Sequence, residues 1–162
     1  MVTSNDNADI SKLYKLLSNV VDPEIPVLTL QDLGVLRDIS VNNGEVIVTI
    51  TPTYAGCPAL DVMRSDIEDT LTRAGHQLIR VKTSLSPAWT TDWMSDSGRE
   101  KLRAYGIAPP AMTSCGQQLD EIACPQCGSA DVQKISEFGS TACKALYQCQ
   151  QCREPFDYFK CI

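Results

Sequence analysis

The sequence has little of what a self-sufficient enzyme usually needs. It contains one histidine, His76, which follows Gly75 at an expected helix end and is expected to lie on the surface, so no Cys–His pair is available for nucleophilic catalysis. It also lacks a glycine-rich phosphate-binding loop and the paired Glu-x-x-His motifs of an internal di-iron site. We therefore do not expect this chain to be catalytic alone.

Long apolar runs are missing as well, since none approaches the ~18 residues of a membrane span. Residues 1–9 are polar and lack both the basic start and the apolar centre of a signal peptide. The sequence thus predicts a cytoplasmic protein, in a compartment that keeps thiols reduced. The net charge of −6 argues against nucleic acid and membrane surfaces as partners and leaves protein partners open.

Cysteine, by contrast, is abundant. Six of the eight cysteines fall between residues 115 and 152. Such crowding in a reducing compartment favours metal ligation, and a secreted disulfide framework is the alternative. Two Cys-x-x-Cys turns supply four thiolates with 21 residues between them, and zinc accepts four thiolates in a tetrahedron. The predicted ligands of a structural zinc are Cys124, Cys127, Cys149 and Cys152.

The rest of this segment fits a zinc ribbon over residues 122–162, with strand-forming residues between the two turns. Rubredoxin-type iron uses the same four thiolates and remains an alternative. The additional thiols Cys143 and Cys161 leave an iron–sulfur cluster open, although we interpret them, like Cys115, as non-ligand cysteines. A closed set of four ligands leaves no open position for chemistry, so the predicted site is a folding staple and a docking surface for protein.

The N-terminal part predicts an α+β fold. Apolar residues at helical spacing indicate a helix over residues 9–21, and a second one begins at Pro58 and ends near Gly75. Alternating residues predict strands over 35–41, 46–50 and 78–85, the first two joined through Asn43-Gly44 as a hairpin. The order α-β-β-α-β predicts a small sandwich with two helices covering one face of the sheet.

The predicted domains are residues 1–110, a linker over 111–121 and the ribbon over 122–162. Within the first domain, an irregular segment with Trp89 and Trp93 precedes a short helix that ends at Tyr105. The two tryptophans suit either an interface anchor or a cap on the sheet.

One further cysteine stands apart from the ribbon. Cys57 comes directly before the predicted second helix, where free N–H groups and the helix dipole stabilise a thiolate. Gly56 is expected to let the backbone approach closely, and Pro58 to fix the turn. The simpler interpretation is a small buried side chain.

The motifs Asp22-Pro23-Glu24-Ile25-Pro26 and Gly56-Cys57-Pro58 resemble those of SufT-type iron–sulfur assembly factors. Together with the tryptophan segment, Tyr105-Gly106-Ile107-Ala108-Pro109-Pro110 and the ribbon, they extend the resemblance over nearly the whole chain to the PaaD family, D subunits associated with bacterial phenylacetyl-CoA epoxidase.

This resemblance implies an accessory role in a multicomponent ring-epoxidising monooxygenase of aerobic phenylacetate catabolism. Its partners would be the oxygenase subunits, the flavin and iron–sulfur reductase, or iron–sulfur assembly carriers. The chain would help to assemble or maintain an iron or iron–sulfur centre, with Cys57 as a reactive thiol for transient iron or cluster and Asp22 as its acidic companion. The alternatives are a purely structural subunit of the oxygenase and a rubredoxin-like electron carrier.

Overall fold

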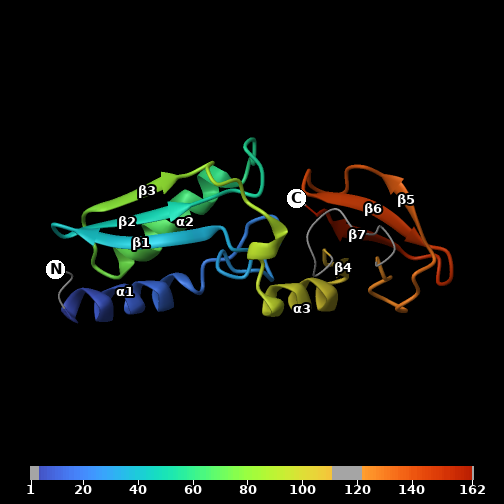
Figure 1. Cartoon of the computed structure of the whole chain (residues 1–162), viewed down its shortest axis with the longest axis horizontal. Helices are drawn as coiled ribbons and strands as arrows, with labels where there is room; N and C mark the ends of the chain where they lie inside the picture. The colour runs from blue at the N-terminus through green and yellow to red at the C-terminus, as the bar shows by residue number, and fades with distance from the viewer. Residues whose placement is uncertain (1–3, 111–121, 162) are drawn as a thin grey trace. The chain divides into compact units, whose positions relative to one another are not determined.

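The computed structural model describes residues 4–110 and 122–161, and the chain divides into two compact units, Met1–Trp89 and Thr90–Ile162. Each unit has its own sheet, of three strands in the first and four in the second (Figure 1). The predicted α-β-β-α-β order and the C-terminal ribbon are confirmed. No helix among the described residues is long and apolar enough to cross a membrane.

The first unit contains two helices and a mixed sheet in the order β1-β2-β3. β1 pairs with β2 in antiparallel fashion, and β2 pairs with β3 in parallel. The hairpin turn has positive φ at Asn43 (50°) and Gly44 (81°), as the Asn-Gly pair predicts. The elements are α1 (Ser4–Leu17), β1 (Leu36–Asn42), β2 (Glu45–Ile50), α2 (Leu60–Arg73) and β3 (Ile79–Thr83).

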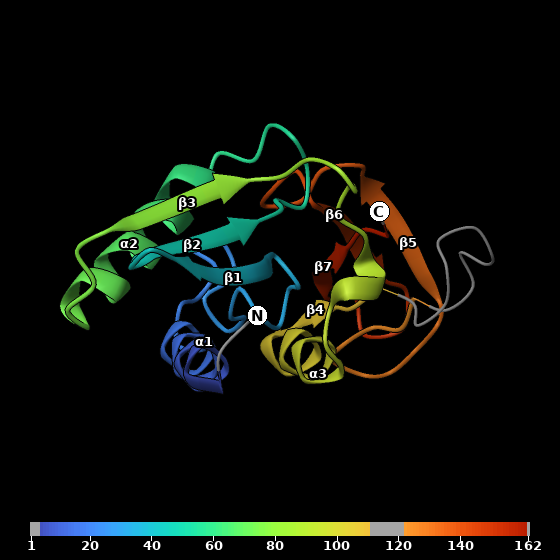
Figure 2. The same cartoon turned by 60° about the vertical axis from the view of Figure 1, so that its left-hand side comes forward.

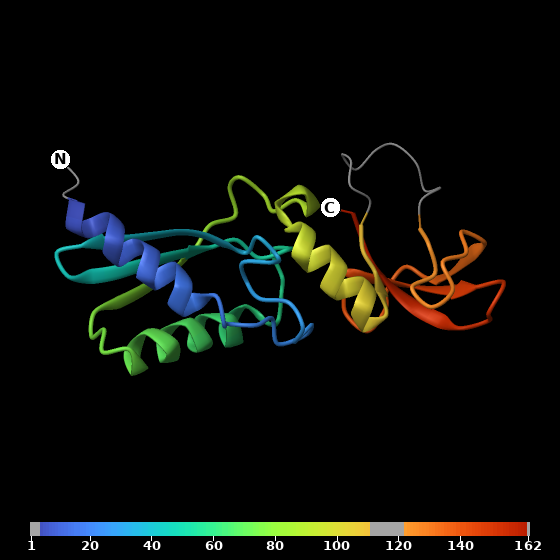
Figure 3. The ribbon, with the colours of Figure 1, turned by 90° about the horizontal axis from the view of Figure 1, so that it is seen from below.

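Both helices run along the strands of this sheet, as the view from below shows (Figure 3). Helix α2 packs on β3, and α1 packs on β1 and on α2. One face of α2 is buried, through Met63, Ile67 and Leu71, and on β2 Val48 and Ile50 are buried as well. The core of the first unit therefore lies between the helices and one face of the sheet.

Three helix boundaries differ from the prediction, and the first is the start of α1, which lies at Ser4 rather than at residue 9. Helix α1 ends at Leu17 rather than near residue 21, because Val20 and Asp22 pair their backbone groups with Leu30 and Leu28 instead of continuing the helix. Helix α2 begins at Leu60, two residues after the proline. At the end of α1 backbone bonds to a later turn override the local pattern, whereas before α2 a local turn, with the Leu60 N–H bonded to the Cys57 carbonyl, takes the place of the first helical residues.

The second unit carries a four-stranded sheet in the order β4-β7-β6-β5. Strand β4 pairs in parallel with β7, so residues that precede the predicted linker supply a strand to the ribbon's sheet. The predicted boundaries at residues 110 and 121 flank a segment outside the described residues, and they stay a prediction. The elements are η1 (Thr91–Trp93), α3 (Asp96–Tyr105), β4 (Ile107–Ala108), β5 (Val132–Ser136), β6 (Lys144–Cys149) and β7 (Pro155–Phe159).

Helix α3 is held in the second unit by a buried arginine. Ser95 caps its N-terminus by accepting the Gly98 N–H, and Gly106 ends it with φ of 93°. Arg99 is 8% exposed and donates to the carbonyls of Thr91 at 2.8 Å and Pro110 at 2.7 Å. These bonds tie the two ends of the segment around α3 together.

The two tryptophans lie in different units. Trp89 is 3% exposed and its Nε1–H donates to the Leu33 carbonyl at 2.9 Å, so it packs as part of the first unit's core. Trp93 is half-buried in η1 of the second unit. Each unit thus holds one of the chain's two indole groups.

Candidate metal centre and reactive thiol

The four cysteines of the Cys-x-x-Cys turns come together in the second unit. Their sulfurs all lie within 4.8 Å of one another, with 3.7 Å between Cys124 and Cys152 and 3.6 Å between Cys127 and Cys149. A tetrahedral zinc with Zn–S bonds of about 2.3 Å places its sulfurs ~3.8 Å apart. The four thiols therefore fit a single tetrahedral ion.

Each turn is closed by backbone bonds that aim its sulfurs inward. In the first, the Gly128 N–H donates to the Cys124 carbonyl at 2.8 Å. In the second, the Arg153 N–H donates to the Cys149 carbonyl at 3.1 Å. Both closing residues have positive φ, 76° at Gly128 and 68° at Arg153. This left-handed conformation lets each Cys-x-x-Cys turn, here called a knuckle, close on itself.

Electrostatics already favours a thiolate in this cluster. The pKa of Cys149 is lowered to about 6, first because the backbone N–H of Cys152 donates to its sulfur. For Cys152 the Glu154 backbone N–H lowers the pKa, but burial and the neighbouring thiols outweigh it and raise the pKa to about 12. Without a cation, then, the thiols compete for negative charge, and a divalent ion removes that competition.

The additional cysteines do not join this cluster, and Cys161 is disulfide-bonded rather than a free thiol. Cys143 is buried next to the start of β6, whereas Cys149 ends that strand. The sulfur of Cys143 lies 3.0 Å from Thr141 Oγ1, and the sulfur of Cys161 lies 3.5 Å from Thr91 Oγ1. Among the described residues the cluster holds four cysteines and no further ligand, and Cys115 lies outside those residues.

Cys57 is buried, with 8% of its surface exposed, although its neighbours Gly56 and Pro58 in the same turn are exposed. Its N–H donates to the Tyr54 carbonyl and its carbonyl accepts from the Leu60 N–H, both at 3.2 Å. Since α2 begins at Leu60, Cys57 lies one turn ahead of the helix rather than at its cap. The expectation for Gly56 is wrong: a Cβ there would meet only the Tyr54 ring, at 3.8 Å, which is ordinary contact.

Asp22 shapes the chain between α1 and β1. It is 5% exposed, and Oδ1 accepts the backbone N–H groups of Glu24 at 2.8 Å and Ile25 at 2.7 Å. This geometry is that of an Asx turn. Asp22 is therefore a turn former, and its role as companion of the thiol stays a prediction.

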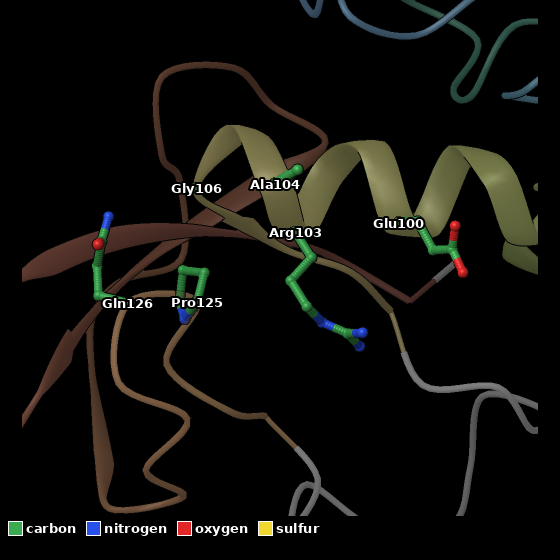
Figure 4. Close-up of a pocket in the computed structure, with 6 residues that line it drawn as sticks. All are labelled: Glu100, Arg103, Ala104, Gly106, Pro125 and Gln126. Carbon is green, nitrogen blue, oxygen red and sulfur yellow. The ribbon is translucent and has the colours of Figure 1, made fainter.

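A groove of about 370 Å³ lies in the second unit beside the first knuckle (Figure 4). One wall is helix α3, with Glu100 and Arg103, and the other is the Pro125-Gln126 pair between Cys124 and Cys127. No local pattern in the sequence signals this juxtaposition or the role of Arg99, because both depend on how α3 packs and on backbone carbonyls as partners.

Two family models match the chain. Residues 10–81 match the iron–sulfur cluster assembly protein family, and residues 108–160 match the PaaD zinc beta ribbon domain. The first match covers most of the first unit, with Cys57 and Asp22, and the second covers the four clustered cysteines.

The chain is also similar to proteins with known names. It is 51% identical over 94% of its length, and over 93% of the relative, to the D subunit of the "Putative 1,2-phenylacetyl-CoA epoxidase" of Escherichia coli. It is 33% identical over 56% of its length, and 87% of the relative, to the "Fe-S protein maturation auxiliary factor" of Porphyromonas gingivalis. A crystal structure of a DUF59 domain of unknown function from Bacillus anthracis matches 60% of this chain and 94% of that chain with 30% identity and a TM-score of 0.57.

Proposed function

This chain belongs to the PaaD family of phenylacetyl-CoA epoxidase D subunits, and we propose that it serves that epoxidase by helping to assemble or maintain one of its iron or iron–sulfur centres. One observation carries the proposal. The unit that matches iron–sulfur assembly proteins has a single cysteine, Cys57, whereas the four clustered thiols belong to the other unit.

A single thiol sets the kind of chemistry that Cys57 can perform. Stable iron–sulfur clusters are usually held by four cysteines, so one thiolate supplies only part of a ligand set. Iron or a cluster would therefore be cargo, bound transiently while the client or a carrier contributes the other ligands.

The clustered cysteines take a different part in this proposal. Cys124, Cys127, Cys149 and Cys152 would hold a zinc ion that folds the ribbon, and four ligands leave it no position for substrate. The ribbon would then dock the client. Strand β5 and the residues that follow it offer exposed apolar side chains for that purpose, Ile135 at 54% and Phe138 at 63%, the latter with the Lys160 ammonium 4.6 Å from its ring centre.

The test replaces the cysteine in a strain that expresses the whole epoxidase. With Cys57→Ala we expect the purified oxygenase and reductase to be present in normal amounts, with one of them depleted in iron and low in activity. The matched control is Cys143→Ala, which removes a buried thiol outside both candidate sites and should leave client iron unchanged. Full iron content and activity with Cys57→Ala would rule out a chemical role for this thiol.

A further inference from the structure

Strand β3 forms one edge of the sheet in the first unit, and no described strand pairs with its outer side (Figures 1 and 2). Exposed leucines flank it, Leu78 with 58% and Leu85 with 57% of its surface accessible. An open edge presents unpaired N–H and C=O groups to any extended chain. Such an edge is either protected against pairing or used for it.

The hydrogen bonds to β2 determine which backbone groups face outward. The Leu78 carbonyl accepts from Val46, and the Ser84 N–H donates to Ile50, so even-numbered residues face β2. Because alternate residues of a strand direct their backbone groups to the same side, Ile79, Val81 and Thr83 face outward. These three residues offer a ladder to an incoming strand.

One outward group already has a partner that can be displaced. Arg64, on helix α2, donates from its guanidinium to the Val81 carbonyl at 3.3 Å. The carbonyl at the centre of the edge is thus capped by a side chain rather than by a strand. An arriving strand would exchange this long side-chain bond for a backbone bond.

The charges on the edge discriminate between partners. Arg80 and Lys82 alternate with buried Val81 and both point to the face of the sheet away from α2. Arg80 forms a partly exposed ion pair with Glu45 at 2.9 Å, whereas the neighbour of Lys82 on β2 is Thr49. In a two-fold antiparallel pair of β3 strands centred on the valine, Arg80 of one copy would face Lys82 of the other, and like charges directly opposite are destabilising.

We propose that the outer edge of β3 receives an extended strand from another protein, with an acidic side chain opposite Lys82 and a β-branched one opposite Val81. Backbone bonds to Ile79, Val81 and Thr83 would supply affinity, and the Lys82 ammonium would select the acidic residue and reject a second copy. This docking surface is independent of Cys57 and of the ribbon, so it stands or falls separately from the proposed function.

The experiment titrates the isotope-labelled full chain with a synthetic peptide of alternating valine and glutamate, followed by NMR. We expect the backbone amides of Ile79, Val81 and Thr83 to shift, and a peptide with lysine in place of glutamate to bind at least ~10-fold more weakly. Thr83→Pro removes an outward N–H without breaking the bonds to β2 and should weaken binding about 10-fold, whereas the matched Thr83→Ala should not.

Two further variants keep the test decisive if the proline variant folds poorly. Arg64→Ala frees the Val81 carbonyl and should tighten binding of the acidic peptide. Lys82→Glu should reverse the preference between the two peptides. The proposal is overturned if the acidic peptide shifts no β3 amide in the parent and Arg64→Ala proteins, if the preference survives Lys82→Glu, or if sedimentation shows that the parent chain pairs with itself through β3.

Discussion

In the first unit two helices bury long apolar side chains against a sheet, whereas the second unit surrounds a cluster of four thiols with short, partly exposed strands. Of the twelve largest fully buried side chains, ten lie in residues 1–89 and two, Leu102 and Phe159, in residues 90–162. Strand β5 has no fully buried residue at all. The first unit can therefore fold by burial, whereas the second buries fewer large apolar side chains, and we expect bonds to a metal ion to contribute to its folding.

This difference separates two uses of cysteine within one chain. Thiols that supply folding energy must be saturated by their ion, and saturated thiols are chemically inert. A thiol that handles cargo must be unsaturated, and it has to lie in a unit that is stable without it. Cys57 lies in the unit held by burial, which is what the proposed cargo-handling role would require.

The largest expected effect is loss of the metal. Chelation of the zinc, or Cys149→Ser, should unfold the second unit because structural zinc contributes ~10–16 kcal/mol in small metal modules. The indole N–H signals in NMR spectra distinguish the units: Trp93 should move to its unfolded position while Trp89 stays. Cys143→Ala serves as the control and should keep the metal. Simultaneous collapse of both indole signals would contradict the comparison.

The next effect lies in the core of the first unit. Leu71→Ala removes a side chain with no exposed surface from α2 and should lower the free energy of unfolding of that unit by about 2–5 kcal/mol. Val62→Ala is the matched control on the same helix, because Val62 is 46% exposed. It should change the free energy of unfolding by less than ~0.5 kcal/mol. Urea unfolding of the zinc-loaded protein measures both. Loss of zinc in the Leu71 variant would show that the two units do not fold separately.

A smaller effect is expected from Arg99, whose hydrogen bonds stabilise the second unit independently of the metal. Arg99→Met keeps the length of the side chain but removes the charged donor to the carbonyls of Thr91 and Pro110, while the Thr91 carbonyl keeps its bond from the Met94 N–H. We expect a loss of about 3 kcal/mol in the second unit with zinc still bound, because buried carbonyls lose charged donors. Lys101→Met, on a half-exposed position of α3, is the control. Zinc content and urea unfolding are the measurements, and an unchanged midpoint would show that the arginine stabilises nothing.

The comparison between the units also explains what the sequence could predict. The ribbon ligands and the α-β-β-α-β order follow from local signals, namely the two Cys-x-x-Cys turns, the Asn43-Gly44 hairpin and alternating apolar residues. Helix ends were less predictable because Val20 pairs with Leu30, a contact that no local pattern encodes. The pairing of β4 with β7 was not predicted either, because a two-residue strand is too short to show a periodic pattern.

The candidate site was predictable to a similar extent. Spacing alone identified the four clustered thiols, and the proline after Cys57 indicated a turn ahead of a helix. Residue spacing does not predict packing. The groove beside Pro125 and the burial of Arg99 depend on how α3 packs in the second unit. The role of Cys57 rests on family resemblance, because a lone buried cysteine is by itself an ordinary core residue.

The smallest effect concerns Asp22, where fold and proposed function overlap. Asp22→Ala removes the acceptor of two buried N–H groups and should cost the first unit about 1–2 kcal/mol, whereas Asp22→Asn keeps one oxygen for them and should cost less than ~1 kcal/mol. Thermal unfolding measures this difference. If the carboxylate is also needed for the proposed role of Cys57, the asparagine variant should be stable, but the purified client should contain less iron. If Asp22→Asn restores both stability and client iron, the aspartate is a turn former alone, and Cys57 works without an acidic companion.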